Sequence, residues 1–141
     1  MPTRPTGTIL LVDDDYGVRV ALRCLLTAEG HTVLEASHGT EAIDLVRLRR
    51  GNVDLVLADV VMPEMNGTEL AATLDREFPG LPVILMSAYA PTGMIRVGRQ
   101  SHTVPVLRKP FASGQLEVVI QVALMHRPPR ERSGRRPAAA I

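Results

Sequence analysis

The sequence contains one cysteine and one lysine among its 141 residues. A single cysteine excludes an internal disulfide framework. No run of about 18 apolar residues occurs, so the sequence predicts no membrane-spanning helix. Residues 1–7 lack the apolar stretch of a signal peptide, and we interpret them as a short disordered lead. We therefore expect a cytoplasmic protein that does not engage a membrane.

Positive charge is concentrated at one end of the chain, although the net charge is only +1. Residues 127–141 carry five arginines and one glutamate. This segment also contains several prolines and no aromatic residue, which is typical of a flexible basic tail. Without aromatic or helical support, we expect it not to bind nucleic acid. Residues 8–126 remain as one globular domain, and 45% hydrophobic residues in the chain can supply its core.

Five short apolar segments recur along this domain and predict strands. They are residues 8–12, 32–36, 55–58, 83–86 and 104–107. Most of them do not alternate between apolar and polar residues, which is typical of parallel strands covered on both faces. Glu35 in the second segment and Pro105 in the fifth favour positions at the edges of a sheet.

Amphipathic helical patterns separate these strands. Their apolar stripes fall within residues 18–26, 42–46, 70–78 and 116–124. Asn66 followed by Glu69 fits a capping box at the start of the third helix. We also expect a helix over residues 91–100. It should be short or mobile, because Gly93 and Gly98 lower helix propensity.

Strand and helix alternate five times, which predicts an α/β fold of the flavodoxin-like (βα)5 type. Its doubly wound, parallel five-stranded sheet has right-handed crossovers. With the second and fifth strands at the edges, the strand order is 2-1-3-4-5. Ligands of such sheets bind beyond the carboxyl ends of the strands, near the switch point between the first and third strands. Polar residues at those ends are therefore the candidate site.

Carboxylates follow two of these strands. Asp13, Asp14 and Asp15 come after the first strand, and Asp59 comes after the third. Carboxylates gathered in one crevice repel each other unless a cation neutralises them, and Mg²⁺ is a suitable partner. For Asp15 the alternative is a cap on the helix that follows, and we expect that role.

A hydroxyl and an ammonium group join the same edge, because Ser87 ends the fourth strand and Lys109 ends the fifth. This set suits phosphoryl transfer to the Asp59 carboxylate. The lysine and a metal would neutralise the phosphoryl oxygens, and the hydroxyl would donate a hydrogen bond to one of them. Lys109 is the only lysine beside fifteen arginines, which favours a role for a compact ammonium, although an ordinary surface lysine is the alternative.

These residues lie in the segments LLVDDD, DLVLADVVMPEMNG, LMSAYA and LRKPF. Four segments in this order and at this spacing resemble the receiver domains of response regulators in bacterial two-component signalling. The resemblance covers about residues 8–126. The sequence is similar to receivers of hybrid histidine kinases and of single-domain response regulators.

The resemblance implies a full set of site residues. They are Asp59 as phosphoacceptor; Asp13, Asp14, Asp59 and the backbone carbonyl of Val61 as Mg²⁺ ligands; Ser87, Ala88 and Lys109 as switch and phosphate-binding residues; and Pro110 after a cis peptide bond. It also implies a histidine kinase or phosphotransfer protein as phosphoryl donor and a downstream protein partner. We expect a monomer or weak homodimer that catalyses only its own phosphorylation and dephosphorylation, and so is not an enzyme.

The sequence departs from the family's pattern at three positions. Val106 stands three residues before Lys109, where many receivers carry an aromatic switch residue. Val61 and Tyr89 flank the path of the attacking water in this family, and neither is an acid or an amide, so we expect slow self-dephosphorylation.

Two other functions stay open at this stage. The first is a receiver-fold interaction module that works without phosphorylation, and the second is a small phosphatase with an acidic metal site. No DNA-binding or catalytic segment follows the domain, so we expect output through protein contacts. The four histidines show no metal-ligand spacing, and we expect them at the surface.

Overall fold

Strands and helices alternate along most of the chain in the computed structural model, which describes residues 5–98 and 102–126. The elements are β1 (Thr8–Val12), α1 (Tyr16–Ala28), β2 (Thr32–Ala36), α2 (Gly39–Leu48), β3 (Leu55–Asp59), α3 (Gly67–Glu77), β4 (Val83–Ser87), β5 (Gly93–Val97), β6 (His102–Arg108) and α4 (Ser113–Met125). The sheet has the order β2-β1-β3-β4-β6-β5. Its first five strands in that order are parallel, which confirms the predicted doubly wound sheet with β6 in the fifth place.

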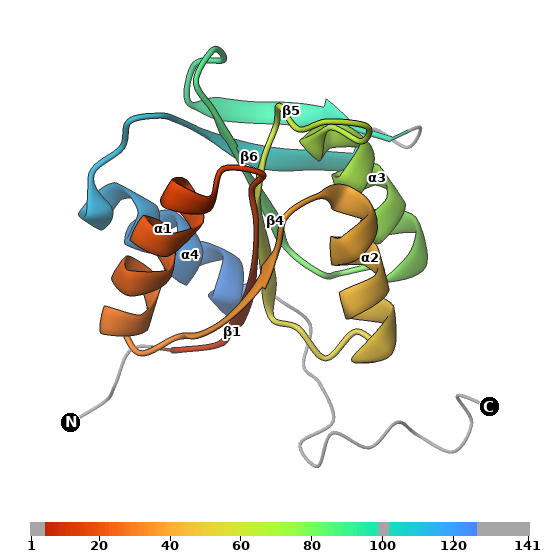
Figure 1. Ribbon diagram of the computed structural model, residues 1–141, viewed down its shortest axis with the longest axis horizontal. Helices are drawn as coiled ribbons and strands as arrows, with labels where there is room; N and C mark the ends of the chain where they lie inside the picture. The colour runs from red at the N-terminus through yellow and green to blue at the C-terminus, as the bar shows by residue number, and fades with distance from the viewer. Residues whose placement is uncertain (1–4, 99–101, 127–141) are drawn as a thin grey trace.

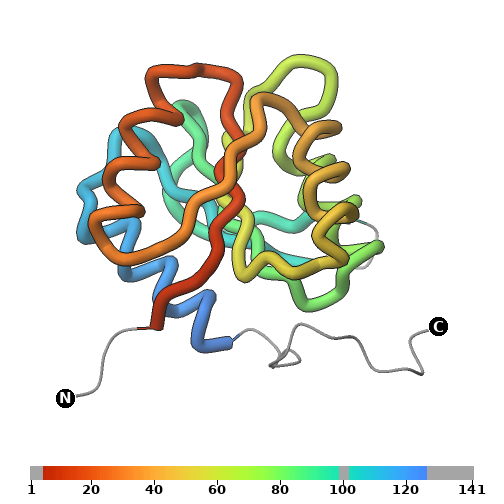
Figure 2. Tube along the Cα trace, turned by 60° about the horizontal axis from the view of Figure 1, so that its bottom comes forward, coloured from red at the N-terminus to blue at the C-terminus, as the bar shows by residue number. Residues whose placement is uncertain are grey.

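The sheet lies between two pairs of helices (Figures 1 and 2), and it separates two hydrophobic clusters. On one side α2 and α3 cover residues such as Leu10, Val56 and Leu85. On the other side α1 and α4 cover their sequence neighbours, such as Leu11 and Ile84. Successive residues of a strand point to opposite faces, so apolar residues at every position are what a sheet covered on both faces requires. This explains why the central strands do not alternate in polarity.

The prediction of a helix over residues 91–100 is wrong where the structure describes that segment. Gly93–Val97 forms β5, which pairs antiparallel with β6 and lies at the edge of the sheet. Ile95 and Val97 pack into the core on the α3 side, whereas Met94 and Arg96 are exposed. This alternation is the period of a strand, and it overrides the weak helical pattern. Residues 99 and 100 lie outside the described residues.

A second correction follows from β5, which adds a sixth, antiparallel strand to the predicted five-stranded sheet. The fifth parallel strand, β6, is an interior strand and not an edge, because β5 covers it with Met94 opposite Pro105. The opposite edge is as predicted, since within residues 5–98 and 102–126 β2 with Glu35 pairs only with β1.

Helix starts agree with the sequence. The Asp15 carboxylate accepts a bond from the Val18 N–H and caps α1. Asn66 and Glu69 form the predicted reciprocal capping box at α3. None of the helices in residues 5–98 and 102–126 is long and apolar enough to cross a membrane.

The expectation of a surface position is wrong for His31. Only 4% of this residue is exposed, and its Nε2 lies 3.2 Å from Oε2 of Glu117 on α4. Its Nδ1 accepts a bond from the Gly7 N–H, and the Pro5 carbonyl accepts one from Gln121. A partner 86 residues away in the sequence keeps this imidazole in the interior. Residues 1–4 of the predicted lead and the whole predicted tail lie outside the described residues.

Candidate functional site

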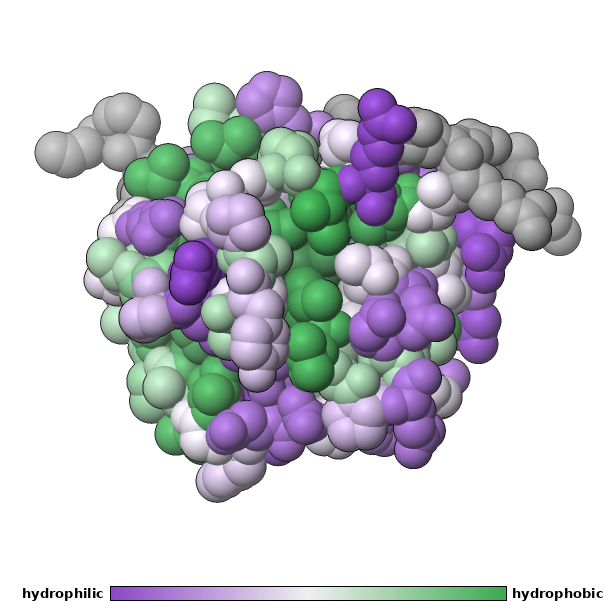
Figure 3. Space-filling view, turned by 90° about the horizontal axis from the view of Figure 1, so that it is seen from above, coloured by the Kyte–Doolittle hydropathy of each residue, from purple (hydrophilic) through white to green (hydrophobic). Residues whose placement is uncertain are grey.

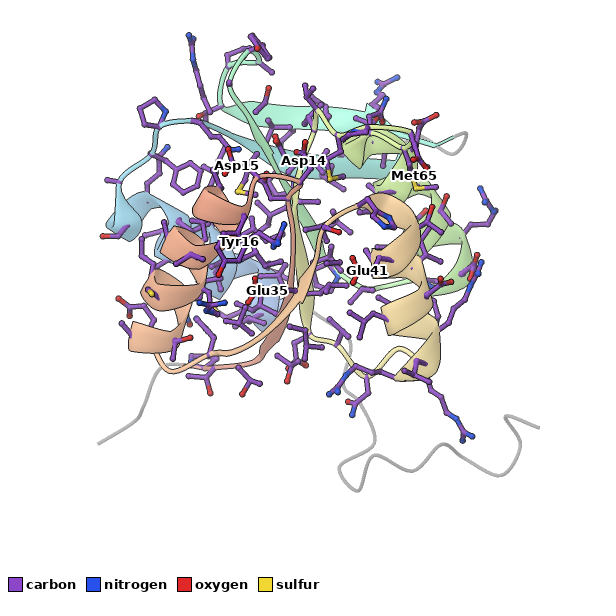
Figure 4. The ribbon with its side chains drawn as sticks, viewed as in Figure 1. Asp14, Asp15, Tyr16, Glu35, Glu41 and Met65 are labelled. Atoms are coloured by element: carbon purple, nitrogen blue, oxygen red, sulfur yellow. The ribbon has the colours of Figure 1, made fainter. Side chains whose placement is uncertain are left out.

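The site residues meet because parallel strands end at one edge of the sheet. Asp59 is the last residue of β3 and Ser87 the last residue of β4, while Asp13 and Lys109 directly follow β1 and β6. Figure 4 shows Asp14 and Asp15 at this end of the molecule, where β1 turns into α1. Figure 3 looks onto the same end and shows hydrophobic residues reaching the surface among hydrophilic ones.

Three carboxylates converge at this edge. One carboxylate oxygen from each of Asp13, Asp14 and Asp59 lies within 4.8 Å of the others. Asp13 is buried, Asp14 is exposed and Asp59 is intermediate between them. The set offers hard oxygen ligands, and this donor chemistry fits a divalent cation such as Mg²⁺.

The Lys109 ammonium group lies between two of these acids. Its Nζ is 3.2 Å from Oδ2 of Asp13 and 3.5 Å from Oδ2 of Asp59. Burial raises the pKa of the Asp59 carboxyl above its ordinary value; Lys109 opposes this rise, and the Asp13 carboxylate adds to it. One ammonium group therefore does not offset the cost of gathering these carboxylates, which favours an additional cation.

Ser87 is buried and its hydroxyl is held by the loop that follows β4. Its Oγ accepts bonds from the N–H groups of Tyr89 at 3.1 Å and Ala90 at 3.0 Å. A hydroxyl has two lone pairs and one hydrogen, so both lone pairs are used and the hydrogen remains for donation. Ala88 lies within this turn.

The loop after Asp59 approaches the site closely. The Gly67 N–H donates to the Val60 carbonyl at 2.8 Å, and a Cβ atom at Gly67 would lie 2.5 Å from the Asp59 carbonyl oxygen. Val61 is exposed at the rim, and its backbone N–H slightly lowers the pKa of the Asp59 carboxyl, against the larger effect of burial. On the facing loop, the peptide bond between Lys109 and Pro110 is cis.

Sequence reasoning missed Arg19, whose guanidinium reaches back from α1 to the Asp13 carbonyl at 2.6 Å. It also binds Glu35 on β2. The sequence offered one signal for this contact. Arg19 lies one turn into the helix that follows the acids, and Glu35 is an acid within the predicted edge strand. Val106, where the family often has an aromatic residue, is a fully packed core residue.

Comparison with known proteins identifies the family. A model of the response regulator receiver domain matches residues 9–121. The chain is 36% identical to the sensor kinase CckA of Brucella abortus (strain 2308), over 84% of this chain and 13% of that protein. It is 35% identical to the sporulation initiation phosphotransferase F of Bacillus subtilis (strain 168), over 73% of this chain and 82% of that protein. A crystal structure of the receiver domain from the hybrid histidine kinase CckA is 32% identical with a TM-score of 0.69, over 84% of this chain and 99% of that one.

The chain therefore belongs to the response regulator receiver domain family, the signalling modules of two-component systems. It spans 13% of the length of the sensor kinase but most of the sporulation protein, so its relatives include both long and short proteins.

Proposed function

We propose that this chain is a phosphorylation switch in which Asp59 accepts a phosphoryl group from a histidine kinase or a phosphotransfer protein. An Asp59 carboxylate oxygen attacks phosphorus and forms the P–O bond. The P–N bond to the donor histidine breaks, and the histidine nitrogen keeps the bonding electron pair. The observation that carries the proposal is the convergence of Asp59 with Asp13, Asp14 and Lys109 at the carboxyl ends of the strands.

Asp13, Asp14, Asp59 and the Val61 carbonyl would hold a Mg²⁺ ion, which supplies positive charge toward the phosphoryl oxygens when bound. The Lys109 ammonium supplies a second positive charge from the β6 side. Because burial raises the pKa of Asp59, this carboxylate is less well stabilised than one in water, and neutralising cations stabilise it in its nucleophilic form.

Ser87 and Ala88 would bind the phosphoryl group from the β4 side. The Ser87 hydrogen can donate to a phosphoryl oxygen while its oxygen keeps the bonds from Tyr89 and Ala90. An event at Asp59 is thereby linked to the loop that leads into β5. Output would pass through contacts of this surface with a downstream protein.

The phosphorylated state should be long-lived. Val61 and Tyr89 are the exposed side chains beyond Asp59 and Ser87, and neither has a carboxylate or amide that could orient a water molecule. A phosphoryl lifetime of seconds in the purified chain would contradict this proposal. The expectation that residues 127–141 do not bind nucleic acid stays a prediction, since these residues lie outside those described.

The direct test is intact-mass spectrometry after incubation with acetyl phosphate and Mg²⁺. The native chain should gain one phosphoryl group, and it should gain none without Mg²⁺ or as the Asp59→Asn variant. Turnover of a separate phosphate ester would instead favour a phosphatase. Absence of any adduct, together with absence of Mg²⁺ binding by titration, would favour an interaction module that works without phosphorylation.

A further inference from the structure

Arg19 on α1 connects the acidic turn to the edge of the sheet. One of its terminal nitrogens donates to the Asp13 carbonyl at 2.6 Å, and its Nε donates to Oε1 of Glu35 on β2 at 3.3 Å. Its guanidinium also lies 5.5 Å from the centre of the Tyr16 ring. The side chain is only 14% exposed, so it is held in place on several sides and does not move freely in solvent.

The peptide groups on both sides of Asp13 are fixed by these contacts. The Asp13 N–H donates to the Ala36 carbonyl of β2 at 3.2 Å, and the Asp13 carbonyl accepts the bond from Arg19. The carbonyl belongs to the peptide group that joins Asp13 to Asp14. The orientation of this peptide group therefore sets the direction in which the Asp14 side chain leaves the backbone, and it sets how the turn leads into α1. The Asp13 carboxylate closes the turn by accepting the Asp15 N–H at 2.9 Å.

Two effects of Arg19 on a bound cation oppose each other. As a positive charge near the acids, it would weaken cation binding, and its removal would strengthen it. As a support for the turn, it would keep the Asp13 and Asp14 carboxylates near Asp59, and its removal would weaken binding. The nearby Glu35 carboxylate, which also binds Arg23 at 2.6 Å, offsets part of this charge, whereas the bond to the Asp13 carbonyl acts directly on the turn that carries the ligands. The second effect should therefore dominate.

We propose that Arg19 is a positioning residue for the divalent cation of this site, acting through the Asp13 carbonyl. The proposal rests on the function proposed above, since it needs a cation held by Asp13, Asp14 and Asp59. Arg19 touches neither the phosphoryl group nor the Asp59 carboxylate in this role. It restricts the turn that carries two of the ligands.

Arg23 provides a matched control. It lies one helical turn further along α1 and donates to the same Glu35, but its side chain is 41% exposed and its described bond goes to that glutamate alone. Loss of either arginine removes one positive charge and one bond to Glu35. Only loss of Arg19 also removes the bond to the Asp13 carbonyl.

The test is Mg²⁺ binding to the full chain by isothermal titration calorimetry at neutral pH, with urea unfolding in the absence of metal as the stability readout. Arg19→Met should raise the Kd for Mg²⁺ about tenfold, the lower end of the effect of outer partners on metal ligands. Arg23→Met should change it by less than about twofold. Arg19→Lys, which can reach the carbonyl but cannot bridge to Glu35 as a planar fork, should fall between the two.

The outcomes separate this proposal from the proposed function. An unchanged or lowered Kd in Arg19→Met, with wild-type binding intact, would overturn the positioning role alone. If Arg19→Met does not fold, an unchanged Kd in a folded Arg19→Lys chain would overturn it equally. If the wild type binds Mg²⁺ but forms no phosphoryl adduct on Asp59, the proposed function alone would be overturned. A wild-type chain that does not bind Mg²⁺ would overturn both.

Discussion

The polar cluster around His31 should be a major source of stability at the end of the sheet opposite the acids, and Glu117→Ala is the change that tests it. Glu117 accepts a bond from His31 Nε2 at 3.2 Å and from Gln121 at 2.7 Å. The Gly7 N–H donates to Nδ1, so the imidazole hydrogen is assigned to Nε2, where it points at the carboxylate. Truncation of Glu117 leaves this buried donor without an acceptor.

The size of the effect follows from burial. The His31 side chain is fully buried and that of Glu117 is 9% exposed, so water cannot replace the lost acceptor without rearrangement. Removing one partner of a buried hydrogen bond costs about 1–3 kcal/mol, and the upper end applies where the lost partner is charged. We expect the free energy of unfolding to fall by about 3 kcal/mol, which for a domain of this size lowers Tm by roughly 10 °C.

Urea unfolding followed by circular dichroism measures this loss. Gln115→Ala, at an exposed position of the same helix, is the control and should change stability by less than about 0.5 kcal/mol. Glu117→Gln keeps an acceptor for His31 and should cost less than Glu117→Ala. A double-mutant cycle with His31→Ala should show strong coupling. Additive single losses, or a Glu117→Ala loss no larger than that of the control, would refute the reasoning.

Three further predictions concern the turns and charges near the acids. Gly67→Ala should cost about 2 kcal/mol or more by urea unfolding, because its Cβ would meet backbone atoms that cannot yield, whereas Gly114→Ala on α4 meets nothing within 4 Å and should gain up to about 1 kcal/mol. Asn66→Ala removes the capping box of α3 and should cost about 1 kcal/mol in the same assay; no loss would contradict the cap. Burial raises the pKa of Asp59, so its stabilising contribution is present below the ordinary carboxyl pKa and is lost as pH rises through the raised value. Without metal, Asp59→Asn should therefore be more stable to urea than the wild type at neutral pH, with a smaller difference in acid; equal stability at neutral pH would contradict this.

The parallel part of the fold could be predicted because strands that are buried on both faces have continuous apolar runs in the sequence. Residues 55–58 of β3 are all apolar, which is typical of a strand covered on both faces. The segment of β5 carries a weaker mark. Its five residues fit the repeat of a helix as well as that of a strand, and Gly93 and Gly98 favour neither helix nor strand. The strand therefore forms because it pairs with β6, not because of local propensity.

The candidate site was predictable for a related reason. Once the strands are assigned as parallel, their carboxyl ends must meet, and Asp13, Asp59, Ser87 and Lys109 each stand within one residue of such an end. No contact needs to be known in advance. His31 was mispredicted because its burial depends on Glu117 on α4, a contact that local pattern does not encode.

Arg19 shows how residues placed by the strand ends depend on residues placed by long-range contacts. The strand ends place the carboxylates at one edge, but they do not fix the direction in which each one points. That direction depends on the peptide groups of the turn, and an arginine from the next helix, balanced by an acid from the edge strand, holds one of them. Glu35 in β2 therefore marks the edge of the sheet and also neutralises the arginine that supports the turn. A strand with an apolar residue at that position would still pair with β1, but Arg19 would then be a partly buried charge without its partner, which costs more than the lost pair contributes.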